Sequence, residues 1–192
     1  MGNEDQFHLH EYPPSNHLLA NSPYNPDVAR ALLAVAGYPD GFTTTLKLPP
    51  PSYARRGGEI IASQLREIGI ETEVSNLEWA QWIEEVFTNK DFGLSIVSHT
   101  EPMDIGIYAR PEYYFQYDNP AFQDLMTRLT ATADPDQRRA MLQEAQTIIS
   151  TDYVNGYLFQ LAATSVAKTG VQGMWLNAPT QAIDLTGISW AD

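Results

Sequence analysis

The stretch of residues 25–42, which reads NPDVARALLAVAGYPDGF, constrains the fold more than any other part of the chain. Asn25 can accept a backbone N–H bond as the N-cap of a helix, and Pro26 fits the first helical position, which needs no backbone donor. Gly37 ends the helix in the left-handed conformation, and the Pro-Asp-Gly turn after it leads into a β-rich run at residues 43–48. The stretch therefore predicts a helix, a turn and a strand, which together make one unit of an α/β domain.

An apolar stripe marks the inner face that we expect for this first helix. Val28, Leu32 and Val35 follow one another at spacings of four and three residues, so their side chains share one face. We expect this face to pack on a sheet.

Helices and strands alternate along most of the chain. A strand, a helix and a strand in succession imply right-handed crossovers and a mainly parallel sheet. The expected fold class is therefore α/β, with a mainly parallel sheet flanked by helices. After strand 43–48, the expected elements are helix 54–68, strand 70–75, helix 79–88, strand 93–98, helix 120–133, a helix from Asp134-Pro135 to about Ser150, a strand from Tyr157 to Ala163, and irregular structure from Gly170 to Asp192.

Helix 54–68 is expected to pack through Ile61, Leu65 and Ile68. Gly57 and Gly58, near its start, each lower helix propensity by about 1 kcal/mol. We therefore expect these glycines to allow close approach of a neighbouring backbone.

Composition narrows the class of protein. At 192 residues the chain fits one domain with an extended arm at residues 1–24, and 43% hydrophobic with 18% charged residues is typical of globular proteins. The net charge of −13 repels phosphate backbones and anionic bilayers, so nucleic acid is not expected as a partner. The chain has no cysteine, which excludes disulfides and thiolate chemistry, and no apolar run approaches the ~20 residues of a membrane span.

The wording of several short segments resembles one protein family. The pattern AxxLLxxAGYPDGF at residues 29–42 is similar to the start of the C-terminal lobe in family 5 of the extracellular solute-binding proteins, which serve peptide, oligopeptide and nickel ABC importers. The resemblance extends from about Tyr24 to the C-terminus. Further similar segments follow in the same order, namely residues 62–70, Glu78-Trp79, Asp91-Phe92-Gly93, Asn119 to Phe122 and Arg138 to Ile149.

This resemblance implies a single lobe of a type II periplasmic-binding-protein fold at residues 25–192, without the N-terminal lobe and the signal peptide of family members. It implies the ligand-binding lobe of a substrate-binding protein, which captures a peptide-like or other small polar solute for an ABC permease. It also implies a periplasmic or extracellular location, with membrane association through the transporter.

An alternative is a stand-alone interaction module derived from such a lobe. Without its partner lobe, an aromatic half-cleft is expected to face water, and large exposed apolar patches usually find a partner. We therefore expect weak self-association, with Tyr108, Tyr113 or Tyr114 buried at the contact.

The segment that follows strand 93–98 combines tyrosines, an arginine and carboxylates. In open parallel sheets, the loops at the carboxyl ends of the strands form the usual ligand side. Tyrosine has a rigid apolar body with a polar tip, and the planar guanidinium of arginine matches a carboxylate. Either these side chains contact a ligand, or they pack the loop onto the sheet while the charges face water. The predicted ligand-binding residues are Ser98, His99, Glu101, Asp104, Tyr108, Arg110, Tyr113 and Tyr114.

The family resemblance bears on the ligand. Peptide-binding members place an aspartate a few residues ahead of a Glu-Pro or Asp-Pro pair, where it holds the ammonium group of the ligand. Glu101-Pro102 matches the pair, whereas the aspartate position falls on Ser98 or His99. This departure argues against an ordinary α-amino peptide as the ligand, unless Glu101 or Asp104 takes over the role of the aspartate. Sugars, opine-like conjugates and modified peptides remain open.

Enzyme signatures are missing from the sequence, which has no GxSxG, HExxH, GxGxxG or Walker-type glycine loop. We therefore predict no enzyme activity, no catalytic residue and no cofactor. His8, His10 and His17 lie in the N-terminal arm, and we interpret them as arm residues rather than as a metal site. Trp79 and Trp82, three residues apart near a helix start, favour packing over stacking on a ligand.

Overall fold

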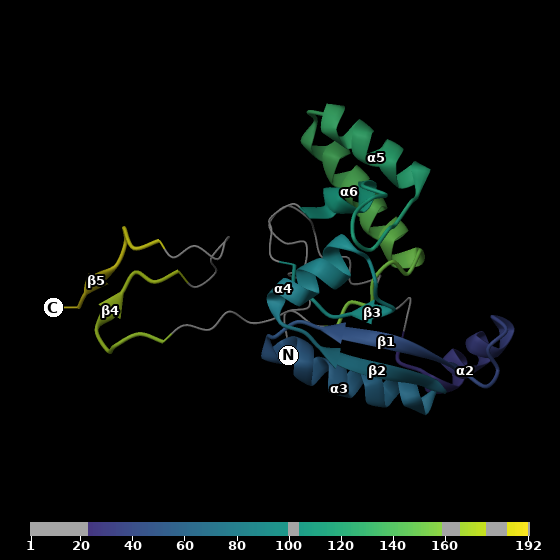
Figure 1. Cartoon of the computed structure of the whole chain (residues 1–192). Coiled ribbons are helices and arrows are strands. Elements are labelled where there is room, and N and C mark those ends of the chain that lie inside the picture. The colour runs from purple at the N-terminus through teal and green to yellow at the C-terminus, as the bar shows by residue number, and fades with distance from the viewer. Residues whose placement is uncertain (1–22, 100–103, 159–165, 176–183, 192) are drawn as a thin grey trace. The chain divides into compact units, whose positions relative to one another are not determined.

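The computed structural model of the chain describes residues 23–99, 104–158, 166–175 and 184–191 (Figure 1). These residues form two compact units. The sheet unit holds residues 23–99 and 110–118, and the helical unit holds residues 104–109 and the described residues from 119 onward. The expected boundary between an arm and a lobe stays a prediction, because residues 1–22 lie outside the described ranges.

The first helix of the sheet unit confirms the reading of residues 25–42. Helix α2 spans Pro26–Val35, and the Asn25 side chain accepts a hydrogen bond from the Val28 amide at 3.1 Å. Gly37 follows the helix with φ of 92°, in the left-handed region that favours glycine. The local cap and turn signals therefore fold as expected.

The apolar stripe of α2 does not pack on a sheet, and that prediction was wrong. Val28, Leu32 and Val35 are 51%, 62% and 86% exposed. The helix is held at its polar side instead, since Arg30 Nη1 donates to the Glu67 carbonyl at 2.8 Å. Helix α2 thus meets the end of the next helix, and its apolar face stays exposed.

The sheet is parallel, as predicted. Strand β1 (Phe42–Leu48) lies in the middle, with β2 (Ile70–Asn76) on one side and the short β3 (Leu94–Ser95) on the other. Strand β1 runs in register with β2 from Phe42 opposite Ile70 to Leu48 opposite Asn76. On the other side, Lys47 lies opposite Ser95. Strand β1 is therefore hydrogen-bonded to a strand on each side and is the central strand of the sheet.

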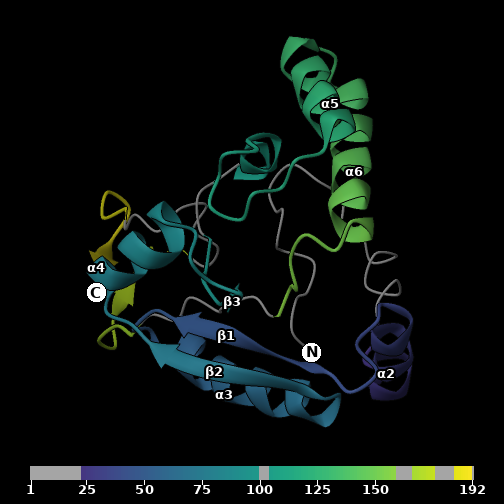
Figure 2. The same ribbon diagram turned by 45° about the vertical axis from the view of Figure 1, so that its right-hand side comes forward.

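Helix α3 (Ser52–Glu67) lies along one face of β1 and β2 (Figure 2). Its buried residues are Ala54, Gly58 and Ala62, so the prediction that Ile61, Leu65 and Ile68 form the buried face was wrong. Those three larger side chains are only partly buried. The physical reason is close approach, because small residues let the helix backbone lie against Leu46 and Leu48 of β1.

The expected helix at residues 79–88 is present, in two forms. Helix α4 covers Trp79–Trp82, and the π-helix η2 continues it over Ile83–Thr88. A capping box starts the helix, because the Glu78 amide donates to the Gln81 side chain at 3.1 Å. The π-helical geometry was not predicted.

The helical unit contains the short 3₁₀ helix η3 (Asp104–Ala109) and the packed pair α5 (Pro120–Ala131) and α6 (Pro135–Thr151). The expected start of the second helix at Asp134-Pro135 is confirmed, since Asp134 accepts from the Gln137 amide. At the start of α5, Asn119 likewise accepts from the amides of Ala121 and Phe122. Two short antiparallel strands, β4 (Val171–Gln172) and β5 (Ser189–Trp190), occur where irregular structure was expected. Residues 159–163 of the last predicted strand lie outside the described ranges.

Substitution of Gly57 and Gly58, which are adjacent in α3, tests how closely this helix packs on β1. A Cβ atom at Gly58 would lie 2.3 Å from Leu48 Cδ1, and Leu48 is fully buried. A Cβ atom at Gly57 would meet its nearest neighbour, Ile96 Cδ1, at 3.8 Å. We expect Gly57→Ala to stabilise the protein by up to about 1 kcal/mol through helix propensity. We expect Gly58→Ala to lose that gain, because overpacking a closed core costs about 1–3 kcal/mol.

Urea unfolding of the two variants measures this difference. Equal stabilisation by both substitutions would show that Leu48 can move aside, and would contradict the close packing of α3 on β1.

Candidate functional site

Helix α4 begins just after β2, beside the arrowheads of β1 and β2 (Figure 2). Residues 96–99 follow β3, which runs parallel to β1. The carboxyl ends of parallel strands meet at one edge of a sheet, and this edge is where ligands bind in open α/β sheets. The candidate site is therefore built at this edge, entirely within the sheet unit.

An aromatic cluster packs against Val97, in the segment that follows β3. Trp82 and Tyr114 are buried together with Leu77 and Val86, and further aromatic rings pack against them. Neighbouring rings lie 5.1–6.5 Å apart, most of them tilted or edge to face, which is the arrangement that aromatic rings prefer. We define the aromatic cluster as Trp82, Phe87, Phe92, Tyr113, Tyr114 and Phe115.

Tyr114 lies at the centre of this cluster and carries its polar tip. Its ring contacts Trp82 at 5.9 Å and Phe87 at 5.4 Å between ring centroids. Its hydroxyl lies 3.1 Å from His99 Nε2, and the two rings are nearly parallel, with an interplanar angle of 10°. His99 is only partly buried, so this pair presents a polar group at the border of an apolar cluster.

The π-helix explains how two rings of one helix reach Tyr114. Trp82 and Phe87 are five residues apart, and in a π-helix residues at this spacing lie one above the other because the hydrogen bonds run from i to i+5. The Asn89 amide accordingly donates to the Glu84 carbonyl at 2.9 Å. The Trp82 and Phe87 ring centroids lie 6.5 Å apart.

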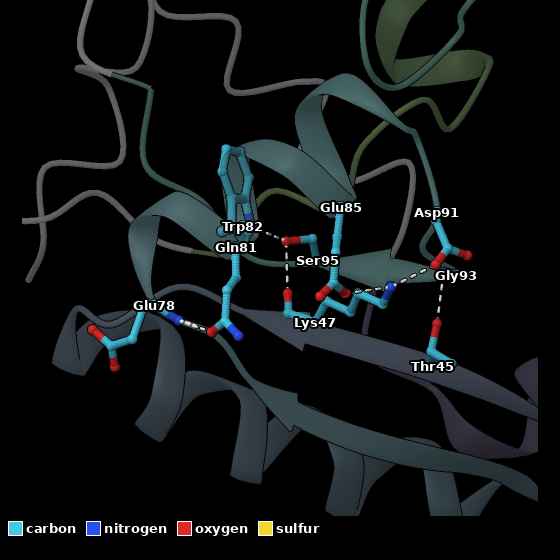
Figure 3. Close-up of polar contacts among 9 residues, drawn as sticks. All are labelled: Thr45, Lys47, Glu78, Gln81, Trp82, Glu85, Asp91, Gly93 and Ser95. Atoms are coloured by element: carbon cyan, nitrogen blue, oxygen red, sulfur yellow. Dashed lines mark hydrogen bonds and ion pairs between the residues drawn. The ribbon is translucent and has the colours of Figure 1, made fainter.

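A buried lysine links this helix to the sheet (Figure 3). Lys47 of β1 is 9% exposed, and its Nζ lies 2.8 Å from Glu85 Oε2 and 2.9 Å from Asp91 Oδ2. The hydrogen bonds to Glu85 and then to Asp91 raise the pKa of the Lys47 ammonium above its ordinary value. The stability that follows from this raised pKa is therefore fully present below the ordinary lysine pKa, and it is lost as the pH rises through the raised value.

Two further hydrogen bonds join the same elements. Trp82 Nε1 donates to Ser95 Oγ at 3.0 Å, and Ser95 Oγ donates to the Lys47 carbonyl at 2.7 Å (Figure 3). The Gly93 amide donates to Thr45 Oγ1 at 2.8 Å. These bonds hold the helix and the segment after it against β1.

The structure brings five of the predicted site residues into the sheet unit. Tyr114 is buried, His99 and Tyr113 are partly buried, and Ser98 and Arg110 are exposed. The Ser98 amide donates to the Tyr53 hydroxyl at 3.0 Å, and the Arg110 carbonyl accepts from the Tyr113 amide at 2.9 Å.

The other predicted residues lie elsewhere. Asp104 and Tyr108 belong to η3 in the helical unit, where the buried Tyr108 hydroxyl accepts from Asn155 Nδ2 and lies 3.4 Å from the Tyr157 hydroxyl. Glu101 lies outside the described residues. Tyr108 and Tyr114 are 6% and 7% exposed, so the expectation that they form an open aromatic surface was wrong. Their rings pack inside the chain instead.

Sequence reasoning missed Phe87, Phe92 and Lys47. A usable signal was present for the lysine, because it stands between two leucines in a strand of a parallel sheet. Such strands are buried on both faces, and a buried lysine requires a partner. The aromatic residues gave no comparable signal, since their contacts with residues 113 and 114 are distant in sequence.

The helical unit has a hollow of its own. It measures about 350 Å³, and Arg138 at its wall donates to the carbonyls of Leu129 at 2.9 Å and Thr132 at 3.1 Å. These bonds cap the end of α5, so the guanidinium serves the fold. The hollow is lined by Ile105, Gly106, Met126, Leu129, Thr130, Arg138 and Leu142.

Membrane-spanning helices and metal-binding clusters are both missing from the described ranges. None of the helices there combines the length and the apolar composition that crossing a bilayer requires. In the same ranges, His, Asp and Glu side chains nowhere gather in threes around a point that suits a metal ion.

Comparison with known proteins gives a family match. Residues 3–118 match the family model described as bacterial extracellular solute-binding proteins, family 5 Middle. The chain is similar to the glutathione-binding protein GsiB of Salmonella choleraesuis, with 31% identity over 176 residues, which is 82% of this chain and 34% of that protein. It is also similar to heme-binding protein A of Haemophilus influenzae, with 36% identity over 72 residues, or 35% of this chain and 13% of that protein.

A solved structure with the same fold is the dipeptide-binding protein from Pseudoalteromonas sp. SM9913 in complex with Met-Leu. The TM-score is 0.68 and the identity 24%, and the match covers 93% of this chain and 39% of that one. The chain thus spans about a third of the length of the glutathione-binding relatives and has the fold of a type II periplasmic binding protein.

Ser95 tests the link between the aromatic cluster and the sheet. We expect Ser95→Ala to destabilise the protein by about 1–3 kcal/mol, because the buried indole N–H of Trp82 loses its acceptor. Ser98→Ala is the matched control, since the described bond of Ser98 uses its backbone amide and the residue is exposed. Urea unfolding followed by tryptophan fluorescence measures both, and equal losses would contradict the role of Ser95.

Proposed function

Because the chain belongs to the bacterial extracellular solute-binding proteins, family 5, we propose that it is the ligand-binding lobe of an ABC-importer substrate-binding protein. In this role it captures a small polar solute for uptake through a membrane permease. The proposal places the protein in the periplasm or outside the cell, at the membrane surface through its transporter. A second lobe then closes over the ligand from the other side.

The His99–Tyr114 pair carries this proposal. His99 follows β3 at the carboxyl edge of the parallel sheet, and it lies within hydrogen-bonding distance of the Tyr114 hydroxyl, at the border of the aromatic cluster. An apolar wall with a few fixed polar groups is the usual composition of a small-molecule site. Ser98, Arg110 and Tyr113 complete the proposed site in the sheet unit. Glu101, Asp104 and Tyr108 remain proposed ligand contacts from the sequence.

The proposed ligand is a peptide-like solute with a carboxylate. The exposed guanidinium of Arg110 offers the planar fork that binds a carboxylate with two hydrogen bonds. Ser98 and His99, which are uncharged or weakly basic, stand where peptide-binding family members carry an aspartate. This arrangement favours a modified peptide, an opine-like compound or a sugar conjugate, and the similarity to glutathione-binding proteins supports a peptide-like one.

One observation favours a second role, self-association. The stripe of Val28, Leu32 and Val35 on α2 is exposed, and contiguous apolar surface of this kind favours a partner. We expect weak self-association in sedimentation at high concentration, reduced by Leu32→Gln. Ile60→Gln, at a similarly exposed apolar position on α3, is the control. A monomer at millimolar concentration contradicts this second role and leaves ligand binding untouched.

Ligand binding by this chain is expected to be weak. One lobe offers about half of the contacts, and halving a binding free energy of about 8 kcal/mol leaves about 4 kcal/mol, which corresponds to a millimolar dissociation constant. We expect backbone chemical shifts of residues 98–99 and 110–114 to move on titration with glutathione or with opine-like and sugar conjugates.

Substitutions sharpen this test. Arg110→Ala should weaken binding of carboxylate ligands, because a charge-assisted hydrogen bond contributes more than a neutral one. Arg139→Ala, which removes another exposed arginine from the helical unit, should leave binding unchanged. Micromolar affinity, or shifts that avoid residues 98–99 and 110–114, would contradict the proposed site.

A further inference from the structure

We infer that Lys47 is a positioning residue of the ligand site, which fixes the aromatic cluster and His99 through its contacts with η2. This inference rests on the proposed function and adds the residue that determines the geometry of the site. Lys47 itself makes no contact with the ligand in this proposal. Its ammonium contacts Glu85 of η2, and its carbonyl contacts Ser95, which binds Trp82 of the cluster (Figure 3).

The side chain of Lys47 joins the sheet to both ends of one short segment. Its ammonium lies 2.8 Å from Glu85, within η2, and 2.9 Å from Asp91, after η2. Lysine is almost never fully buried without a partner, and here two carboxylates supply the countercharge. A single buried charge thus fixes where the π-helix lies along β1.

The main chain of Lys47 holds the same helix by a second route. Its carbonyl accepts from Ser95 Oγ at 2.7 Å, and Ser95 Oγ accepts from Trp82 Nε1 at 3.0 Å. Trp82 immediately precedes η2. The ammonium of Lys47 therefore contacts the helix that carries Phe87 directly, and its carbonyl is linked to Trp82 through Ser95.

The path from Lys47 to the site is short. Trp82 and Phe87 pack against Tyr114 with ring centroids 5.9 Å and 5.4 Å away. The Tyr114 hydroxyl in turn lies 3.1 Å from His99 Nε2. A shift of η2 along β1 therefore moves the rings that hold Tyr114, and with them the polar tip of the site.

The ion pair of Lys47 specifies the position of η2 in addition to stabilising the fold. Leu46 and Leu48 beside it are 1% and 0% exposed, and they already provide the apolar contacts of β1. Replacing a buried ion pair by an apolar residue of similar volume is often close to neutral for stability. An apolar side chain, however, cannot specify a single position for η2, because apolar contacts are not directional.

The test uses the full chain with Lys47→Met, which keeps the volume and removes the charge. We expect it to fold, with an altered near-ultraviolet circular dichroism spectrum and shifted ring signals of His99 and Tyr114. We expect the glutathione-induced shifts at residues 98–99 and 110–114 to correspond to an affinity about tenfold weaker than that of the wild type. Lys47→Arg, which keeps the positive charge, should restore part of both signals.

The matched control is Arg66→Met, which removes an exposed ion pair with Glu71 in the same unit. It should leave the aromatic spectra and the glutathione shifts unchanged. If Lys47→Met does not fold, Glu85→Gln and Asp91→Asn replace it, because these carboxylates are more exposed, with side-chain values of 36% and 79%. Each should then shift the His99 and Tyr114 signals.

Wild-type aromatic spectra and unchanged glutathione shifts in a folded Lys47→Met protein would overturn the inference. Failure of the proposed function gives a different result. The wild type then shows no glutathione shifts at residues 98–99 and 110–114, while the ring signals of His99 and Tyr114 still respond to Lys47→Met.

Discussion

The burial of β1 on both faces is the constraint on which the rest of the sheet unit depends. Leu46 and Leu48 are fully buried against α3, and Lys47 points to the opposite face. On the first face, close contact is possible because Gly58 has no side chain. On the second face, a charge is buried, so two carboxylates must come to it. One strand therefore dictates a small-residue helix on one side and an acidic helix on the other.

Local signals predicted the elements well. Asn25, Asn119 and Asp134 cap the helices that the sequence indicated, because a cap involves only residues a few places apart. The parallel sheet followed from the succession of strand, helix and strand. The buried face of α3 could not be predicted in this way, because periodicity identifies large apolar residues, whereas the close approach of this helix required small ones. Periodicity likewise identified the apolar face of α2 without showing what it meets.

The candidate site was predicted only in part. The tyrosines and His99 were recognisable because they follow a strand end, where ligands bind in such sheets. The contacts that hold them come from far along the chain, as Lys47 and Asp91 are 44 residues apart. No local pattern reports such a pair. The division of the predicted residues between the sheet unit and the helical unit is also a property of long-range packing.

The π-helical form of η2 makes the length of this segment as important as its composition. Phe87 and the ring of Trp82 lie close together in a segment whose hydrogen bonds run from i to i+5 and not from i to i+4. Loss of one residue would close the turn into an α-helix and rotate either the Phe87 ring or the Glu85 carboxylate out of place. A gap of one residue at this point in a related chain would therefore signify a differently shaped aromatic cluster, even where every neighbouring residue is identical.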